Sequence, residues 1–414
     1  MDTLSKICRR QVLGMPFVLA LAGKAENSFA AEKKKIAAIV TVYRYNSHAE
    51  VMIPKMIEGY EYYGKHHESL VEVVSMYTDT VPDIDLSRRD MAKYDVPIYP
   101  HIRDALTLGG NDLAVDGVVL IGEHGDYPLN EKGQKLYPRY RLYKEIMNVF
   151  RETGRSVPVF SDKHLSVDWN EAKWMYDQSH ELNFPFMAGS SLPLWWRKPI
   201  LELDLQTPVE KAIALYGNGG ESSGIHALET LQCMVERRKG GETGVAAVQC
   251  LRGNQARKWI ESNRWASRLL EHGRLDNQPD PPDSDAKRPE LYVLEYRDGL
   301  QAAVFGGIKR SWSFAAEIKG KKEPVYTLFH TTGGRPHGHF CTLVYYIEKM
   351  IATGRAVYPV ERTLLTTGTL AALFDSRYQS GKRVKTPHLN VTYHAQKESV
   401  FNTGKFPPLD KEKN

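Results

Sequence analysis

Hydrophobic residues from position 36 onward form short apolar runs that alternate with segments of helical period. The apolar runs predict strands at 36–41, 70–77, 117–121, 157–160 and 185–187, and the periodic segments predict helices at 49–60, 86–93, 102–108, 139–152 and 168–182. This alternation, with strands that are apolar throughout, is typical of βαβ units around a mostly parallel sheet buried on both faces. Pro54 should kink the first of these helices or delay its start.

The pattern changes after Trp196, where longer alternating stretches replace the short apolar runs. Asp298 and Gly299 stand between the strand-like stretches 291–296 and 301–305, which is a strong hairpin signal. Helical periodicity returns at 224–237, 255–271, 340–353 and 363–378. We therefore expect an α/β protein in which the N-terminal parallel sheet is followed by an α+β domain with a largely antiparallel open sheet.

The same changes predict the domain organisation. We expect an export signal over 1–30, a first domain over 31–195, a second domain over 196–386 and a polar, loosely docked C-terminal tail over 387–414. Residues 276–289 hold four prolines without periodicity and should form a surface loop. With 414 residues, the chain is long enough for two domains with sizeable cores.

The composition is that of an ordinary globular protein, with 42% hydrophobic and 25% charged residues. Lys and Arg total 55 and Asp and Glu total 50, which leaves a net charge of only +5, and the two signs are interspersed. This balance predicts no nucleic-acid partner, because nucleic-acid-binding proteins usually carry a basic face. Four cysteines without a C-x-x-C pair support neither a disulfide scaffold nor a cysteine zinc site.

The N-terminus carries the features of a processing segment. Arg9 and Arg10 precede a short apolar run, and Ser28 and Ala30 supply the small residues of a cleavage site. This arrangement resembles a twin-arginine export signal, and it predicts a mature protein that starts near Ala31 and works in the periplasm or elsewhere outside the cytoplasm. The alternative is an uncleaved basic helix. The apolar run is too short to span a membrane, and no later stretch approaches ~18 uncharged apolar residues.

Several chemically active side chains follow directly after predicted strands of the first sheet. Open α/β sheets bind their ligands at the carboxyl ends of the strands, so these side chains are the first candidates for a site. They are Tyr43, Arg44 and His48 after 36–41, Asp79 after 70–77, Glu123, His124 and Asp126 after 117–121, and Lys163 and His164 after 157–160.

Four short sequence patterns occur along residues 36–384. Ser161-Asp162-Lys163-His164 is similar to a Glu-Lys-Pro catalytic turn with the lysine kept, residues 224–229 are similar to a Gly-x-His-x-x-Asp segment, residues 188–199 resemble a domain-linking segment, and residues 369–384 resemble a closing helix and turn. All four are features of the glucose-fructose oxidoreductase, inositol dehydrogenase and rhizopine-catabolism (Gfo/Idh/MocA) family, which this chain resembles.

The resemblance implies that the first domain is a dinucleotide-binding Rossmann fold and that the open sheet of the second covers the nicotinamide. It implies an oxidoreductase that transfers hydride between NAD or NADP and a sugar, glycoside or polyol. Lys163 would bond the substrate hydroxyl and relay its proton, while His226 would orient the substrate or act as general base, so both should converge on one cleft. A homo-oligomer built through the exposed face of the second sheet is a further implication.

Other residues complete the two expected sites. The cofactor-binding residues would be Tyr43, Arg44, Asp79, Glu123 and His124, with Asp79 on a ribose hydroxyl, and the substrate-binding residues would be Trp196, Arg197, Glu229, His337 and His339. No metal ligand is assigned, although the loops at 122–128 and 330–339 hold residues able to bind a metal or a polyol. In a strand, His337 and His339 would place both rings on one face.

The chain departs from the family at the phosphate-binding turn. The glycines of the G-x-G-x-x-G motif fall on Val40, Val42 and Tyr45, whose side chains would obstruct the approach of backbone to pyrophosphate. Arg44 could instead supply a guanidinium. Two alternatives therefore stay open: a redox-assisted glycoside-cleaving enzyme, and a non-catalytic carbohydrate-binding protein that has lost the dinucleotide site.

The export signal generates a direct prediction. If residues 1–30 are removed during export, the intact mass of the protein recovered from its native host should correspond to a chain that begins near Ala31. Full-length protein confined to the cytoplasm would contradict the export signal.

Overall fold

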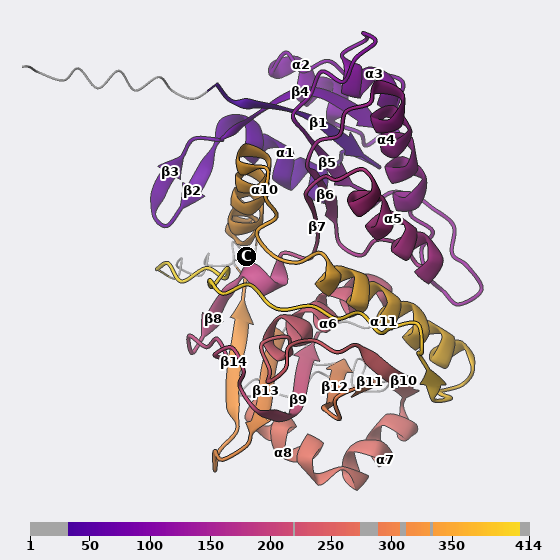
Figure 1. Cartoon of the computed structure of the whole chain (residues 1–414), viewed down its shortest axis with the longest axis vertical. Helices are drawn as coiled ribbons and strands as arrows, with labels where there is room; N and C mark the ends of the chain where they lie inside the picture. The colour runs from indigo at the N-terminus through magenta and orange to yellow at the C-terminus, as the bar shows by residue number, and fades with distance from the viewer. Residues whose placement is uncertain (1–31, 218–219, 274–288, 307–311, 332–333, 406–414) are drawn as a thin grey trace, which may run out of the picture. The chain divides into compact units, whose positions relative to one another are not determined.

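The computed structural model describes residues 32–217, 220–273, 289–306, 312–331 and 334–405 (Figure 1). Contacts divide the chain into residues 1–32 and a second compact unit, residues 33–414, which contains both sheets. The predicted export signal at 1–30 lies outside the described residues, as does the predicted loop at 276–289 except for its last residue.

The first sheet is the predicted parallel sheet, and its Rossmann-like arrangement confirms the fold class. Its strands lie in the order β4-β1-β5-β6-β7, and all of its strand pairs are parallel. The strands are β1 Lys34–Val40, β4 Val71–Thr78, β5 Gly117–Ile121, β6 Val159–Asp162 and β7 Phe186–Gly189. Every residue of β5 is buried, because helices cover both faces of the sheet.

Alternate residues of β1 pack on opposite faces of this sheet. Ile36 and Ala38 share a core with α1 and α10, whereas Ala37 and Ile39 share a core with α3 and α4. The helices of this part are α1 His48–Glu58, α2 Ser87–Lys93, α3 Ile102–Thr107, α4 Arg139–Thr153, α5 Trp169–Glu181 and, much later in the chain, α10 Cys341–Thr353. The helix α10 thus packs on the first sheet although it follows β8 (Trp196–Lys198) to β14 (Val325–His330) of the second sheet in the sequence. The predicted domain boundaries stay a prediction.

Pro54 does not delay the first helix, which was one of the two expected effects. The helix α1 begins at His48, six residues earlier, because the hydroxyl of Ser47 accepts the N–H of Glu50 and caps its first turn. A short hairpin, β2 Tyr60–Tyr62 and β3 Lys65–His67, follows α1 and was not predicted.

The second sheet is mostly antiparallel, as predicted. Its order is β15-β10-β11-β12-β9-β13-β14-β8, and β12 with β9 is its one parallel pair among the described residues. The hairpin expected around Asp298 and Gly299 is formed by β11 and β12. The strands are β8 Trp196–Lys198, β9 Val209–Tyr216, β10 Val245–Arg252, β11 Glu290–Tyr296, β12 Gln301–Gly306, β13 Trp312–Ile318, β14 Val325–His330 and β15 Val384–Lys385.

Helices cover both faces of the second sheet. The helices α6 Glu221–Val235 and α11 Glu361–Tyr378 pack on the face that carries Ala212 and Ala214 of β9. The helix expected at 255–271 is instead two helices, α7 Asn254–Ser262 and α8 Arg264–Gly273. They separate at Asn263, whose backbone leaves the helical region.

The helices α7 and α8 lie on the outer face of the second sheet. Ile213 and Leu215 of β9 pack there against Leu269 and Leu270 of α8. This is the face that we expected to be exposed for a homo-oligomer, and the chain itself covers the apolar residues there. The homo-oligomer stays a prediction.

The described part of the predicted C-terminal tail, residues 387–405, carries buried residues, which corrects our expectation that it is loosely docked. Leu389 is fully buried in the core of the second sheet, and Val400 is buried in the core of the first. Phe401 lies under the guanidinium of Arg197, with 4.1 Å from its ring centroid to Cζ. The apolar residues of this segment follow neither a helical nor a strand period, so its sequence gives no sign of burial.

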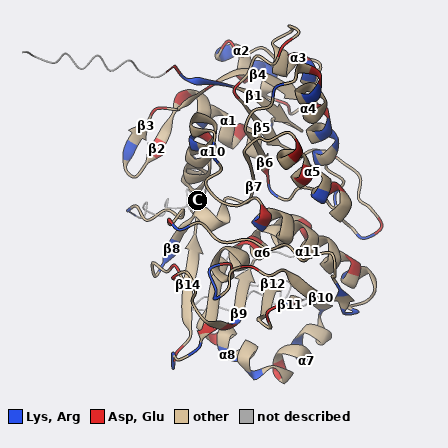
Figure 2. Cartoon of the chain, viewed as in Figure 1, with Lys and Arg blue, Asp and Glu red and all other residues tan. Residues whose placement is uncertain are grey.

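Charges of both signs are interspersed along the described helices, for example on α4 and α5 (Figure 2). No helix among the described residues is both long and apolar enough to cross a membrane.

The buried C-terminal segment generates a stability prediction. Leu389→Ala should lower the free energy of unfolding by ~2–5 kcal/mol, because it leaves a cavity beneath Gly368 of α11. Ile84→Ala, at a side chain that is 62% exposed, is the control and should change it by less than ~0.5 kcal/mol. If the two variants changed the free energy of unfolding in urea by the same amount, the C-terminal segment around Leu389 would be loosely held.

Candidate functional site

Five polar residues gather at the carboxyl edge of the first sheet, and we call them the edge cluster: His48, Glu123, His124, Lys163 and His226. His48 is the first residue of α1, the next two follow β5, Lys163 follows β6, and His226 lies in the second turn of α6. Each of them acts electrostatically on other members of the cluster. The structure therefore brings the two predicted catalytic residues, from opposite sheets, to one place.

A buried carboxylate shared by two cations forms the base of the edge cluster. The Lys163 ammonium lies 2.9 Å from Oε1 of Glu123, and the Arg139 guanidinium lies 2.5 Å from Oε2. All three side chains are at most 5% exposed. Burial alone would raise the pKa of Glu123, but the charges of Lys163 and Arg139 hold it well below its usual value.

The backbone at Lys163 is held in an unusual conformation. Its φ of 63° lies in the left-handed region, which side chains other than glycine rarely adopt. The N–H of Lys163 donates to the carbonyl oxygen of Gly189 at 3.0 Å, at the end of β7. This bond fixes the turn and directs the lysine side chain toward Glu123.

A hydrogen-bonded path joins the edge cluster to the second sheet. His164 Nε2 lies 3.1 Å from a guanidinium nitrogen of Arg139 and 2.7 Å from Oε1 of Glu221. Glu221 is the first residue of α6 and also accepts the N–H of Lys135 at 2.7 Å. Burial and the charge of Arg139 lower the pKa of His164, whereas its contact with Glu221 raises it.

His48 and His124, the two histidines of the edge cluster that belong to the first sheet's side, contact each other. His48 Nδ1 lies 2.6 Å from Oδ2 of Asp162, whose side chain is 1% exposed. The backbone N–H of His48 points at Nδ1 of His124 at 3.4 Å, and the rings meet edge to face at 5.1 Å. Burial and the neighbouring His48 lower the pKa of His124 to about 4, so His124 is neutral at pH 7.

His226 faces the cluster from the second sheet's helix. Its Nδ1 contacts the hydroxyl of Ser190, which follows β7. Burial lowers the pKa of His226, and the positive charge of Lys163 is the next cause. The ring is therefore neutral at pH 7 and lies within electrostatic reach of the lysine.

The start of α1 is where a Rossmann fold holds the pyrophosphate of a dinucleotide. Here the carboxylate of Glu50 accepts the N–H of Asn46 at 3.1 Å and forms an ion pair with Arg335, while Val42 is 1% exposed. The ring of Tyr45 lies 4.5 Å from this guanidinium. An internal carboxylate thus takes the place of the anionic ligand, and these residues do not fit a dinucleotide bound in the usual way.

The expected ribose contact is also engaged within the chain. Asp79 accepts hydrogen bonds from Tyr77 at 3.0 Å and Tyr127 at 2.7 Å, and it is ion-paired with Arg141 at 2.5 Å. Tyr43 is fully buried in the core, and a guanidinium nitrogen of Arg44 donates to the carbonyl oxygen of Tyr45. Of the five expected cofactor-binding residues, only Glu123 and His124 lie in the edge cluster.

The expected substrate-binding residues are spread over a wider region. Arg197 is buried and donates to the carbonyl oxygens of Pro193 and Leu201, and Glu229 accepts the N–H of Ser190 at 2.5 Å. Trp196 is 9% exposed within β8. The hydrogen bonds of Arg197 and Glu229 thus engage backbone outside the edge cluster.

His337 and His339 lie near the start of α1. His337 Nε2 contacts the side-chain oxygen of Asn46 at 3.1 Å, and the rings of the two histidines meet edge to face at 5.8 Å. The segment is a 3-10 turn, Gly338–Phe340, and not the expected strand, and the two rings still lie next to each other. Among the described residues no group of three or more His, Cys, Asp or Glu side chains is arranged to hold a metal ion.

Sequence reasoning missed several residues around the cluster: Arg139, Asp162, Ser190, Glu221, and the pair of Glu50 with Arg335. Asp162 is the immediate neighbour of Lys163 and belongs to the quoted 161–164 pattern, and Glu221 stands five positions before His226. Arg335 lies in the loop 330–339 that the sequence had singled out, but its partner Glu50 is found only through the fold, and Arg139 had no local signal.

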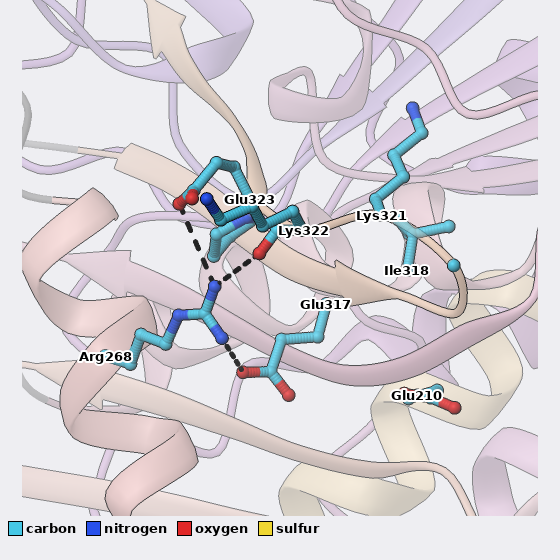
Figure 3. A pocket seen from close by; sticks show the side chains of 9 residues that line it. Glu210, Arg268, Glu317, Ile318, Lys321, Lys322 and Glu323 are labelled. Carbon is cyan, nitrogen blue, oxygen red and sulfur yellow. Dashed lines mark hydrogen bonds and ion pairs between the residues drawn. The ribbon is translucent and has the colours of Figure 1, made fainter.

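A cavity of about 140 Å³ lies far from the edge cluster, at the turn between β13 and β14 (Figure 3). Arg268 of α8 reaches Glu317 and Glu323 across it. Its lining is charged and exposed, so we assign it no part in the site.

Compared by sequence, the chain matches no family model and no curated protein. Its fold is similar to that of solved dehydrogenases, among them myo-inositol 2-dehydrogenase from Lactobacillus plantarum (TM-score 0.54, 10% identity, 86% of this chain and 99% of that chain). Others are myo-inositol dehydrogenase from Lactobacillus casei in complex with NAD(H) and myo-inositol, and GenD2 from gentamicin A biosynthesis in complex with NAD (for each, TM-score 0.54, 12% identity, 85% of this chain and 96% of that chain). At these identities the likeness is one of fold.

The buried carboxylate generates a stability prediction. Glu123→Gln should lower the free energy of unfolding by ~3–5 kcal/mol, because it leaves Lys163 and Arg139 buried without a counter-charge. The control is Glu295→Gln, which breaks the exposed pair with Arg383 and should cost less than ~1 kcal/mol.

The same group sets a pH dependence. The folded pKa of Glu123 is depressed, so its contribution is complete above the usual value of 4.5 and is lost as pH falls below it. The difference between the parent and Glu123→Gln in urea unfolding should therefore be constant from pH ~8 to ~6 and shrink in acid. A difference that grows in acid would contradict an ionised Glu123.

Proposed function

We propose that this chain binds a sugar, a glycoside or a polyol at the edge cluster and, on an oxidoreductase-like fold, takes a proton from one of its hydroxyl groups without a bound dinucleotide. The observation that carries the proposal is the buried Lys163, ion-paired with Glu123 at the carboxyl edge of a parallel sheet and facing a neutral His226 from the other sheet. The fold likeness to dehydrogenases, one of them solved with myo-inositol, supports this substrate class.

The chemistry that these side chains offer is hydrogen bonding and proton transfer. An ammonium has three donors, so Lys163 can give one to Glu123 and another to a substrate oxygen. A neutral imidazole such as His226 can accept from a hydroxyl or donate to it. Because Lys163 and Glu123 are at most 5% exposed, their hydrogen bonds compete with little water, which strengthens the recognition of a polyhydroxylated ligand.

The second candidate is the NAD- or NADP-dependent oxidoreductase of the resemblance, including the glycoside-cleaving variant. Neighbours solved with NAD favour it. The ion pair of Glu50 with Arg335 at the start of α1 favours the first candidate, in which the protein binds a carbohydrate or transfers a proton without a dinucleotide. Absorbance and mass spectrometry of the protein purified from cells separate the two: bound NAD(H) or NADP(H) would support the second candidate and contradict the first.

We also propose that the protein acts outside the cytoplasm, after export through the twin-arginine-type signal. Such export carries folded proteins, so the ion pairs that join the two sheets would form before translocation. A homo-oligomer remains part of the proposal.

The proposed function generates a binding prediction. Saturation-transfer NMR against glucose, methyl glucoside and myo-inositol should show binding of at least one of them to the parent chain. Lys163→Met should weaken it ~10-fold or more, because a hydrogen bond from a charged group is lost. Lys163→Met should still fold, since Glu123 keeps Arg139 as its partner.

The matched control is Lys144→Met, at an exposed lysine of α4, which should bind as the parent does. Binding that is equal in both variants would remove Lys163 from the site, and no binding by the parent would contradict the proposed substrate class.

A further inference from the structure

The three histidines of the edge cluster differ in what their Nδ1 atoms contact. Nδ1 of His226 meets the hydroxyl of Ser190, and Nδ1 of His124 meets the backbone N–H of His48. Nδ1 of His48 is 2.6 Å from the carboxylate of Asp162. Among the described residues, His48 is thus the one histidine of the cluster that is paired through its ring with an acid.

A site that moves a proton from a hydroxyl group needs an acceptor. The Lys163 ammonium, ion-paired with Glu123, has donors and no acceptor. Burial and nearby positive groups lower the pKa of both His124 and His226, which makes them poor proton acceptors at neutral pH. The remaining imidazole is that of His48.

We propose that His48, oriented by Asp162, is the proton acceptor for the substrate hydroxyl in the edge cluster. The inference rests on the proposed function and assigns a role that the resemblance gives to other residues. His48 is the catalytic residue in this assignment, and Asp162 is a positioning residue that acts through it.

The geometry explains why the pair suits this role. With Nδ1–H donated to Asp162, the lone pair of the imidazole stands on Nε2, which has no hydrogen-bond partner among the described residues. The His48 side chain is 16% exposed, whereas Asp162 is 1% exposed, so the ring is the accessible member of the pair. An acid behind a histidine that faces the reacting hydroxyl is the arrangement of many general bases.

The step balances without an oxidant. The O–H bond of the substrate breaks, an N–H bond forms at Nε2 of His48, and the electron pair stays on the oxygen. The imidazolium is compensated by Asp162, and the negative oxygen is compensated by the Lys163 ammonium. The reverse transfer restores both groups.

Titratable groups surround His48 from four elements. They are Glu123 and His124 after β5, Asp162 at the end of β6, His226 of α6, and His337 before α10. Phe340 meets the imidazole edge to face at 5.0 Å. Two carboxylates therefore stand near the ring to offset its charge when it is protonated.

The test is the tautomer of His48, read from the ¹⁵N shifts of the imidazoles in histidine-labelled protein at neutral pH. The spectrum of His48→Gln assigns the signal. In the parent, the proton should be on Nδ1 and Nε2 should be bare. His67 is an internal reference of the opposite kind, because its Nε2 contacts Glu348 at 3.1 Å.

Asp162→Asn is the diagnostic variant. The amide replaces an acceptor by a donor next to Nδ1, so most of the His48 signal should move to the Nε2–H form while His67 stays unchanged. Circular dichroism and the melting temperature show whether the variant is folded. A parent with the proton on Nε2 of His48, or a folded variant with an unchanged His48 signal, would overturn the inference.

The sugar panel separates this inference from the proposed function. If a sugar binds but the proton of His48 is on Nε2, the role of His48 as proton acceptor is contradicted and the proposed function is not. The expected tautomer without binding of any sugar would contradict the proposed function and leave the His48–Asp162 pair intact.

Discussion

The interaction on which the site depends is the buried carboxylate of Glu123, which is shared by Lys163 and Arg139. Three charges are removed from water there, at a desolvation cost that only close contacts can offset. Their mutual contacts fix the ends of β5 and β6 and the start of α4 relative to one another. Through His164 and Glu221 the same network reaches α6, so the second sheet is positioned by the site that it helps to form.

The chain has a fold similar to that of solved inositol dehydrogenases, and its turn before α1 lacks the glycines of a dinucleotide-binding turn. A glycine turn leaves backbone N–H groups at the start of the first helix open to an anion. In this chain Val42 fills the turn and Glu50 supplies the anion from within α1 itself, and Arg335 neutralises it from a distant segment. The carboxyl edge beyond β5 and β6 carries the polar groups of the edge cluster, and this is why we place the function there.

The two sheets are also joined by segments that follow them in sequence. The helix α10 packs on the first sheet after most of the second has been completed, and the C-terminal segment passes from the core of one sheet to that of the other. Unfolding either sheet alone would therefore expose apolar surface on both. We expect residues 33–405 to behave as one cooperative unit in unfolding.

What the sequence determined by itself was local. The apolar period identified the strands of the first sheet, the Asp298-Gly299 turn identified a hairpin of the second, and the strand ends pointed to Glu123 and Lys163. These features depend on neighbours within a few residues. The tertiary structure decided the pairings: His48 with Asp162 across 114 residues, Glu50 with Arg335 across 285, and the burial of Leu389 under α11. The sequence around a charged or apolar residue does not identify its distant partner, because the packing of the helices and strands determines which residues meet.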